Sequence, residues 1–201
     1  MTSSGKKVFN FGCGTTKMEG AINVDHIELP NVDVVFDFEK FPYPIESGSA
    51  DEVHMYFVLE HITDHLGVVR EIYRILKPGG RCYIRVPHFS SMYTWGEFTH
   101  KRGYAFGSFD IFEDSNGRSY YSDIRFRVVK KRIKYFLTYP YNWYKFNTWF
   151  PHWEKKRYGF IVKGLVGTVQ FFIELNPEIF ERFWCYWVGG AAEVYYILEK
   201  R

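Results

Sequence analysis

Glycines and aspartates follow three strand-like runs between residues 7 and 36, and their spacing suits ligand binding. The first run leads into Gly12 and Gly14, which lack Cβ atoms and so let a ligand approach the backbone closely. The second run ends on Asp25 and the third on Asp37. Because carboxylates accept hydrogen bonds, Asp25 suits a pair of ribose hydroxyls and Asp37 suits an adenine amino group. The glycine pair alone is weak evidence, but the ordered set predicts a cleft for a nucleoside.

Alternating strands and helices are predicted around these residues. Strand-like runs recur at 50–56 and 81–86, and the clearest helical pattern of the chain lies between them. Asp64 is a suitable N-cap for this helix, and Pro78 ends it. Such alternation is typical of an α/β fold with a doubly wound, mainly parallel sheet covered on both faces, where ligands bind outside the carboxyl ends of the strands. The helical face consists of residues spaced three or four apart: Leu66, Val69, Ile72, Tyr73 and Leu76.

The second half of the chain has a weaker pattern. Residues 90–118 are rich in Gly, Ser, His and aromatic types, and we interpret them as an active-site loop with a short helix at 106–112. Residues 139–175 are interpreted as mixed loop and amphipathic helix. Three further elements are predicted: a sixth strand at 124–136, a helix that begins at Asn176 with a stripe of Ile179, Phe180, Phe183 and Trp187, and a last strand at 191–199.

Three motifs lie at residues 9–14, 58–62 and 75–81: Phe-Asn-Phe-Gly-Cys-Gly, Val-Leu-Glu-His-Ile and Ile-Leu-Lys-Pro-Gly-Gly-Arg. They resemble, in sequence and spacing, class I S-adenosylmethionine-dependent methyltransferases of the type 11 group. The resemblance is closest over residues 6–90. It implies a Rossmann-like sheet of about seven strands with the last strand antiparallel, S-adenosyl-L-methionine as cofactor and S-adenosyl-L-homocysteine as product.

The resemblance also implies roles for parts of the chain and for individual residues. Residues 1–201 are expected to form a single methyltransferase domain. Residues 6–90 are its cofactor-binding half, and residues 91–201 supply substrate-side loops, an aromatic helical segment and the final strands. The implied cofactor-binding residues are Gly12, Cys13 and Gly14 at the methionine part, Asp25 at the ribose, Asp37 and Phe38 at the adenine, and Tyr56 with Phe57 beside the sulfonium.

Two departures from the pattern of this group lie near the glycine turn. The group commonly has an acid two residues before the first glycine, where this chain has Asn10. A direct attraction to the amino group of the cofactor is therefore lost. Gly14 and Asp25 are also too close in sequence for a helix of about ten residues between them. We expect a shortened or missing first helix, with a turn or loop in its place.

His100 and His88 are the candidates for a general base. Methyl transfer depends mainly on the alignment of donor and acceptor, and a base is needed only where the acceptor keeps its proton. Both histidines follow the fifth predicted strand, where the substrate is expected. A structural role is an equal alternative for each, and His61 is interpreted as an anchor at a helix start. The spacing of His, Cys and Asp residues matches no metal site, so no metal is expected.

Composition and charge limit the classes of partner that can be expected. The chain has 26 basic and 23 acidic residues, and this small excess does not by itself indicate nucleic acid. Three widely spaced cysteines fit no disulfide framework, and we identify neither a signal peptide nor a transmembrane segment, so a cytoplasmic protein is expected. Basic and aromatic residues alternate at 125–134 and 155–157. Nucleic acid, a peripheral membrane surface and a solvated domain edge are all open interpretations of this mixture.

Three classes of function therefore remain. The leading hypothesis is a methyltransferase that acts on oxygen or nitrogen of a small-molecule, sugar or lipid-linked acceptor. The alternatives are a binding or scaffold module with the same fold but no transfer, and a nucleic-acid methyltransferase. A nicotinamide-dependent oxidoreductase is disfavoured, because Lys17 occupies the position of the third glycine in its motif.

Overall fold

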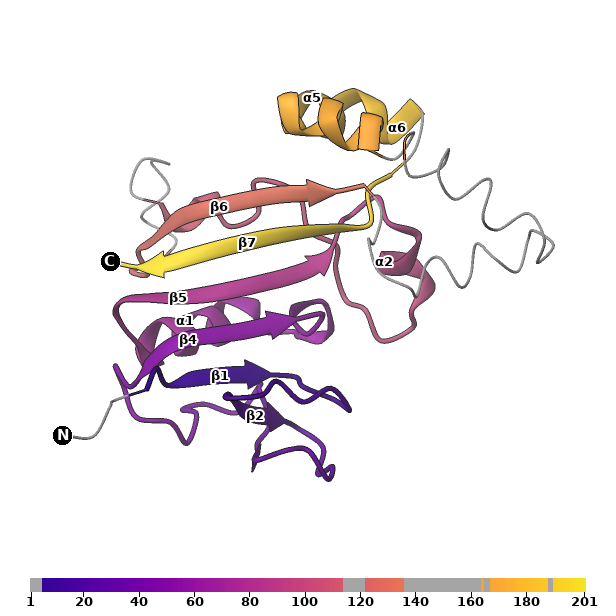
Figure 1. The fold of residues 1–201 in the computed structure, drawn as a ribbon. Helices are drawn as coiled ribbons and strands as arrows, with labels where there is room; N and C mark the ends of the chain where they lie inside the picture. The colour runs from indigo at the N-terminus through magenta and orange to yellow at the C-terminus, as the bar shows by residue number, and fades with distance from the viewer. Residues whose placement is uncertain (1–4, 114–121, 136–163, 165–166, 188–189) are drawn as a thin grey trace.

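The computed structural model describes residues 5–113, 122–135, 164, 167–187 and 190–201. Its strands form one seven-stranded sheet in the order β3-β2-β1-β4-β5-β7-β6 (Figure 1). Strands β1 to β5 pair in parallel, and β7 runs antiparallel to both β5 and β6, which confirms the expected topology. The strands are β1 (Val8–Phe11), β2 (Ile22–Asp25), β3 (Val34–Val35), β4 (Ala50–Tyr56), β5 (Leu76–Pro87), β6 (Phe126–Lys134) and β7 (Glu193–Lys200).

Helix α1 (His65–Ile75) connects β4 to β5 and covers one face of the sheet (Figure 1). It begins where predicted, because the Asp64 side chain accepts a 2.8 Å hydrogen bond from the amide of Gly67. The apolar residues of α1 belong to the main core together with those of β4 and β5. This part of the core comprises Val68, Val69, Ile72, Ile75, Val53, Met55, Cys82 and Ile84. Burial of each large aliphatic side chain contributes ~1.5–3 kcal/mol, so this packing fixes the helix on the sheet.

Apart from the helical residues 167–175, the remaining helices are short. They are η1 (Leu59–His61), α2 (Met92–Gly96), η2 (Asp110–Phe112), α5 (Pro177–Ile179), the π-helical turn η5 (Phe180–Trp184) and α6 (Cys185–Trp187). Asn176 caps α5 as predicted, with its Oδ1 atom 2.9 Å from the amide of Ile179. Of the predicted stripe, Phe180 is buried but Ile179, Phe183 and Trp187 are exposed. The wider π turn changes the angular spacing of the side chains, so the residues do not form one buried face.

A loop, not a helix, joins β1 to β2 at residues 12–21, which confirms the missing first helix. Asn23 of β2 holds this loop. Its side chain accepts a 2.8 Å hydrogen bond from the amide of Met18 and donates one of 3.1 Å to the carbonyl of Ala21. Asn10 of β1 donates to the same side chain at 3.0 Å. The amide at position 10 therefore supports the loop that replaces the helix.

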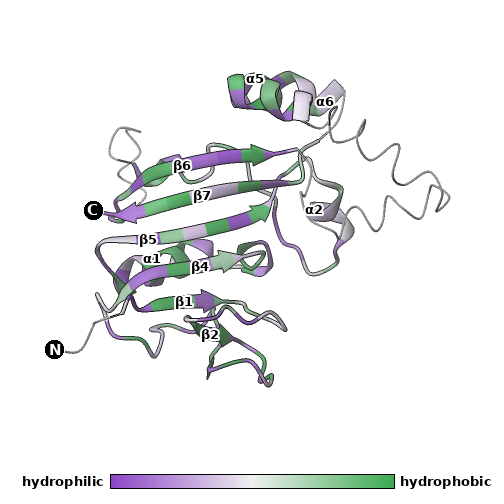
Figure 2. Cartoon of the chain, in the orientation of Figure 1, coloured by the Kyte–Doolittle hydropathy of each residue, from purple (hydrophilic) through white to green (hydrophobic). Residues whose placement is uncertain are grey.

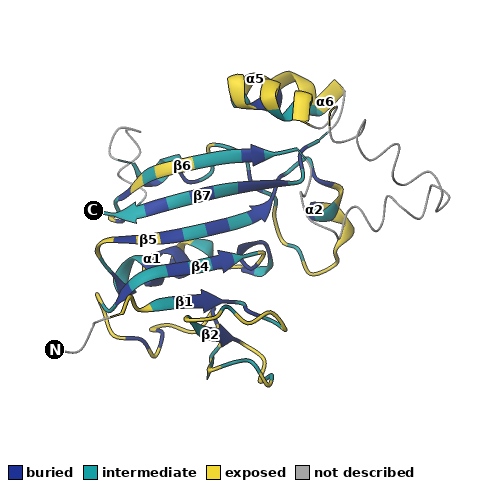
Figure 3. Cartoon of the chain, viewed as in Figure 1, coloured by how far each residue is buried: buried dark blue, intermediate teal, exposed yellow. Residues whose placement is uncertain are grey.

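Helices on both faces of the parallel strands were expected, and the described residues do not show them. Loops join β1 to β2, β2 to β3 and β3 to β4. The face of β4 and β5 opposite α1 instead carries half-exposed polar and aromatic side chains (Figure 3). These are Glu52, His54, Tyr56, Tyr83 and Arg85. The side chains on this face form ion pairs and ring contacts with one another or with neighbouring strands. One example is the stacked pair of His54 and Tyr83, whose ring centroids are 4.5 Å apart.

Several element boundaries differ from the predicted ones. β5 begins at Leu76 rather than at Arg81, because Pro78 and Gly79 lie inside the strand where its register against β4 shifts. Such irregularities are where a strand tolerates proline. β3 is also shorter than the predicted run. Of the segment 139–175, residues 139–163 and 165–166 lie outside the described residues, and 167–175 are helical. None of the helices in the described part of the chain is long and apolar enough to cross a membrane.

Candidate active site

A cleft of about 720 Å³ opens where β1, β2 and β4 end. Six of the residues predicted from the sequence line it together: Gly12, Asp25, Asp37, Phe38, Phe57 and His100. The sheet order explains this gathering, because β2, β1 and β4 are neighbours and the parallel strands end on the same edge. The lining does not include His88, Tyr56, Cys13 or Gly14. The binding or catalytic role of each of these residues, lining or not, remains a prediction.

Asp25 is buried at the end of β2 and is held by backbone amides. Its Oδ2 atom accepts a 2.8 Å hydrogen bond from the amide of Gly14, and its Oδ1 atom accepts from the amides of His26 and Ile27 at 2.8 and 3.2 Å. Each carboxylate oxygen has two lone pairs, so Oδ2 can still accept a hydrogen bond from a ligand hydroxyl. The side chain is therefore oriented before any ligand arrives.

The turn after β1 requires glycine at position 12. Gly12 has φ of +67°, and a Cβ atom there would lie 2.1 Å from Cγ2 of Val58. Gly14 has φ of +52°, but no atom lies within 4 Å of the place a Cβ would take. The two glycines thus serve different needs, close packing at position 12 and backbone conformation at position 14.

The side of the cleft predicted to hold adenine contains Asp37 and Phe38. Asp37 is half-exposed, and its Oδ1 atom accepts a 2.9 Å hydrogen bond from the amide of Glu39. Phe38 is almost fully buried, with ring centroids of Phe11 and Phe36 at 5.4 and 5.3 Å. Its ring therefore supports the wall of the cleft from an aromatic cluster.

Phe57 follows β4 in a left-handed conformation, with φ of 59°. This conformation costs a non-glycine residue of order 1–3 kcal/mol and is found most often at functional sites. The amide of Phe57 donates a 2.8 Å hydrogen bond to the carbonyl of Arg85, and the Arg85 guanidinium lies 5.0 Å from the ring centroid. Tyr56, the preceding residue, lies on the face of the sheet opposite α1. Its hydroxyl is 2.8 Å from Nδ1 of His54.

Cys13 is buried between the two glycines. Burial, and next the charge of Asp25, raise the pKa of the Cys13 thiol. Its Sγ atom lies 3.8 Å from the carbonyl oxygen of Gly14, and the side chain of Asn31 donates a 2.8 Å hydrogen bond to that same carbonyl. The thiol is therefore a protonated, packed group at the turn.

His61 and His100 meet in the cleft, with ring centroids 4.7 Å apart and an angle of 70° between the rings. Nδ1 of His61 is 3.0 Å from the hydroxyl of Thr99, and Nε2 of His100 is 3.4 Å from a carboxylate oxygen of Glu97. Burial is the first cause that lowers the pKa of His61, and the neighbouring His100 is the second. His61 is therefore neutral near pH 7.

Glu60 is a residue of this site that the sequence analysis missed. It is fully buried, and neither oxygen of its carboxyl group has a hydrogen-bond partner among the described residues. Burial raises the pKa of Glu60 to about 8, and the charge of Glu97 adds to the effect. The adjacent Glu60 and His61 within the Val-Leu-Glu-His-Ile motif were the only sequence signal, and adjacency does not reveal that His100 joins them.

His88 does not line the cleft and is completely buried. Its ring nitrogens contact the hydroxyl of Ser90 at 2.6 Å and a carboxylate oxygen of Glu181 at 2.9 Å. Glu181 also accepts a hydrogen bond from the amide of Phe106 at 2.5 Å. His88 thus links the end of β5 to the π turn η5 and to the loop before η2.

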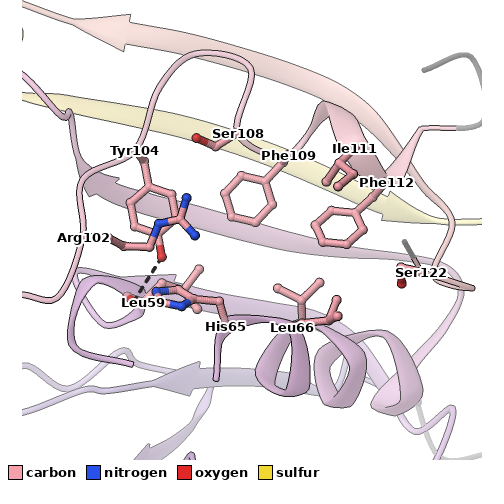
Figure 4. Close-up of a pocket in the computed structure, with 11 residues that line it drawn as sticks. Leu59, His65, Leu66, Arg102, Tyr104, Ser108, Phe109, Ile111, Phe112 and Ser122 are labelled. Atoms are coloured by element: carbon pink, nitrogen blue, oxygen red, sulfur yellow. Dashed lines mark hydrogen bonds between the residues drawn. The ribbon is translucent and has the colours of Figure 1, made fainter. Parts of the chain in front are cut away.

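A second cavity of about 290 Å³ lies between α1 and residues 102–112 (Figure 4). The rings of Tyr104, Phe109 and Phe112 face Leu66 of α1 across it. The Tyr104 hydroxyl donates a 3.1 Å hydrogen bond to the carbonyl of Leu59. None of the residues predicted to bind the cofactor lines this cavity.

Four basic residues of β6 are paired with acids. Lys131 and Lys134 lie 2.7 Å from carboxylate oxygens of Asp110 and Glu193, and two arginines of the strand pair with Glu174 and Glu199. This pairing leaves little free positive charge for phosphate along the strand. The second basic segment, 155–157, lies outside the described residues.

Comparisons with known proteins concern the domain and the fold. Residues 10–84 match the family model of a methyltransferase domain of type 11. No curated protein matches the chain. A solved S-adenosylmethionine-dependent methyltransferase from Archaeoglobus fulgidus is 16% identical, with a TM-score of 0.55 over 98% of this chain and 87% of that one. A putative methyltransferase from Bacillus halodurans is 15% identical, with a TM-score of 0.54 over 97% and 92%. A methyltransferase from Mesorhizobium loti is 12% identical, with a TM-score of 0.53 over 100% and 94%.

At such low identities the solved structures show the fold, which is that of class I methyltransferases. The family match covers residues 10–84, which resemble a methyltransferase domain. The solved structures that share the fold of this chain include S-adenosylmethionine-dependent methyltransferases.

Proposed function

We propose that the cleft binds the adenosyl part of the cofactor and that the methyl group passes to oxygen or nitrogen of a small, lipid-linked acceptor. The observation that carries the proposal is the shared cleft of Gly12, Asp25 and Asp37 with His61 and His100. A volume of about 720 Å³ is within the range of ~300–1,000 Å³ that is typical of small-ligand sites.

In this proposal each group has a separate task. Asp25 accepts hydrogen bonds from the ribose hydroxyls, Asp37 accepts one from the adenine amino group, and Phe57 borders the sulfonium. The lone pair of the acceptor attacks the methyl carbon, and the electron pair of the broken carbon–sulfur bond returns to sulfur. His100 is close to the acceptor and is the candidate to accept its proton. Most of the rate enhancement then comes from alignment of the two reactants.

Exposed apolar side chains near the cleft support a lipid-linked acceptor. Phe98 lines the cleft and is fully exposed, and Met92 and Trp95 of α2 are also exposed. Phe89 contacts Tyr186 of α6, with ring centroids 6.4 Å apart, which connects this region to the exposed aromatic side chains of the C-terminal helices (Figures 2 and 3). Aromatic surfaces of this kind are common at membrane interfaces.

The proposal is tested with S-adenosylmethionine labelled in its methyl group and an extract of the source cells, separated afterwards into lipid, nucleic-acid and protein fractions. Label in the lipid fraction is expected with the native protein and not with Asp25→Ala. We expect no label in the nucleic-acid fraction, because basic residues of β6 are paired with acids. Label in that fraction would contradict the proposed acceptor.

A binding module without transfer is the second candidate function. It is favoured by Asn10, whose side chain bonds to Asn23 and replaces the acid usual in this group. Binding of S-adenosylhomocysteine together with no label in any fraction would support this alternative. The two candidates therefore give different results in the same experiment.

A further inference from the structure

Glu60, His61 and His100 bring three metal-ligating groups to one point beside the cleft. A carboxylate oxygen and one ring nitrogen of each histidine all lie within 4.8 Å of one another. Glu60 and His61 belong to η1, and His100 belongs to the loop that follows α2. The amide of Lys101 donates a 2.7 Å hydrogen bond to the carbonyl of Glu60, which holds this loop against η1.

One carboxylate orients both imidazole rings. Nε2 of His100 lies 3.4 Å from Glu97, and the hydroxyl of Thr99 donates to the other oxygen of Glu97 at 3.2 Å. Because that hydroxyl donates to Glu97, it accepts from Nδ1 of His61 at 3.0 Å. The free lone pairs are then on Nε2 of His61 and Nδ1 of His100. Nδ1 of His100 is buried and has no partner among the described residues.

Among the described residues, no group compensates the burial of Glu60. Its side chain is completely buried, and neither carboxyl oxygen has a hydrogen-bond partner in the part of the chain that the structure describes. A buried carboxylate is costly unless it is paired or binds a metal. Lys101, whose amide bonds to the carbonyl of Glu60, directs its ammonium group to the Thr63 hydroxyl and lies 3.5 Å from Glu39. It therefore does not neutralise Glu60.

We propose that Glu60, His61 and His100 bind one divalent transition-metal ion at the wall of the cleft. Two imidazoles and one carboxylate are a ligand set of zinc, iron and similar ions. Ligand bonds of ~2.0–2.2 Å allow two ligand atoms on one ion to be up to ~4.4 Å apart, so the site closes with small side-chain shifts. Outer hydrogen bonds such as those from Glu97 and Thr99 are typical of built metal sites. Three protein ligands leave a coordination position open toward the cleft, which His61 and His100 line.

The metal site extends the proposed function. Its chemical role rests on the methyl transfer proposed above. A hydroxyl of the acceptor that binds the ion loses its proton more readily. Its oxygen then attacks the methyl carbon, the carbon–sulfur bond breaks with its electron pair on sulfur, and the proton passes to water. His100 holds the ion in this scheme rather than taking the proton itself. The site therefore favours oxygen over nitrogen as the methylated atom.

The test uses the full chain, treated with a chelator and titrated with cobalt(II), whose visible absorption reports inner-sphere ligands, with zinc(II) as competitor. One equivalent is expected to bind. Glu60→Gln, which keeps the shape of the side chain, and His100→Ala should each abolish the absorption band. Glu97→Ala, at an exposed position, should weaken binding ~10–100-fold. His26→Ala is the matched control, because His26 lines the same cleft outside the cluster and should leave metal binding unchanged.

Titration of the same variants with S-adenosylhomocysteine separates this proposal from the proposed function. Cofactor affinity should survive Glu60→Gln and chelation, and circular dichroism checks that each variant is folded. No cobalt band in the native protein, or equal losses for His26→Ala and His100→Ala, would overturn the metal site. Failure of the native protein to bind S-adenosylhomocysteine would count against the cofactor cleft alone.

Discussion

The amide of Gly14 donates a 2.8 Å hydrogen bond to the carboxylate of Asp25. This bond joins the turn after β1 to the end of β2, the two elements that the cleft requires side by side. Because the same carboxylate also accepts from two amides of its own loop, Asp25 fixes the local backbone as well as offering an acceptor to a ligand. Its replacement should therefore affect both binding and stability.

Asp25→Ala should weaken S-adenosylhomocysteine binding by about one to two orders of magnitude, because hydrogen bonds to a charged group contribute ~1.5–3 kcal/mol. It should also lower the free energy of unfolding by ~1–3 kcal/mol, since three amides lose their acceptor. His100→Ala should leave cofactor affinity nearly unchanged. Calorimetric titration of both variants checks this, and equal losses would show that the cofactor does not lie against Asp25.

Substitution of the two glycines should have unequal effects. Gly14→Ala has space for its Cβ atom and should cost only the left-handed conformation, about 1–2 kcal/mol. Gly12→Ala should cost more, because its Cβ would overlap Val58. The double variant Gly12→Ala/Val58→Ala should recover part of that difference in chemical denaturation. Equal stabilities of the two single variants would contradict the packing described for this turn.

Asp37 should recognise the adenine amino group. An analogue of S-adenosylhomocysteine with inosine in place of adenosine presents an oxygen there, which repels a carboxylate. Native protein should therefore bind the analogue at least ~10-fold more weakly, given hydrogen-bond contributions of ~1.5–3 kcal/mol to charged groups. Asp37→Ala should remove most of this discrimination. If the variant discriminates as strongly as the native protein, another residue reads the base.

His88→Ala should destabilise the protein by ~1–3 kcal/mol, because it removes the contacts of the buried imidazole with Glu181 and Ser90. Affinity for S-adenosylhomocysteine should not change, since His88 lies outside the cleft. Thermal unfolding and ligand titration measure the two effects separately. A variant of native stability that has lost methyl transfer would instead support the catalytic role considered from the sequence.

The sequence was most informative where a residue's position along a strand determines its place in the sheet. Gly12, Asp25 and Asp37 each follow a strand, and parallel pairing in the order β3-β2-β1-β4 brings them to one edge. The missing first helix was also predictable, because chain length alone excludes it between Gly14 and Asp25.

Tertiary contacts explain what the sequence could not show. Glu60 and His61 meet His100 where the loop after α2 bonds to η1, through the backbone of Lys101 and the hydroxyl of Thr99. The burial of His88 depends on Glu181, a residue far along the chain. The start of β5 was misplaced because Pro78 and the following glycines are typical of a turn, yet they lie at a register shift inside the strand.

A crystal structure of the complex with S-adenosylhomocysteine tests the assignment of the cleft most directly. The ribose hydroxyls are expected within hydrogen-bonding distance of Asp25, with the adenine amino group at Asp37. A nucleoside bound elsewhere, for example in the cavity between α1 and residues 102–112, would contradict it.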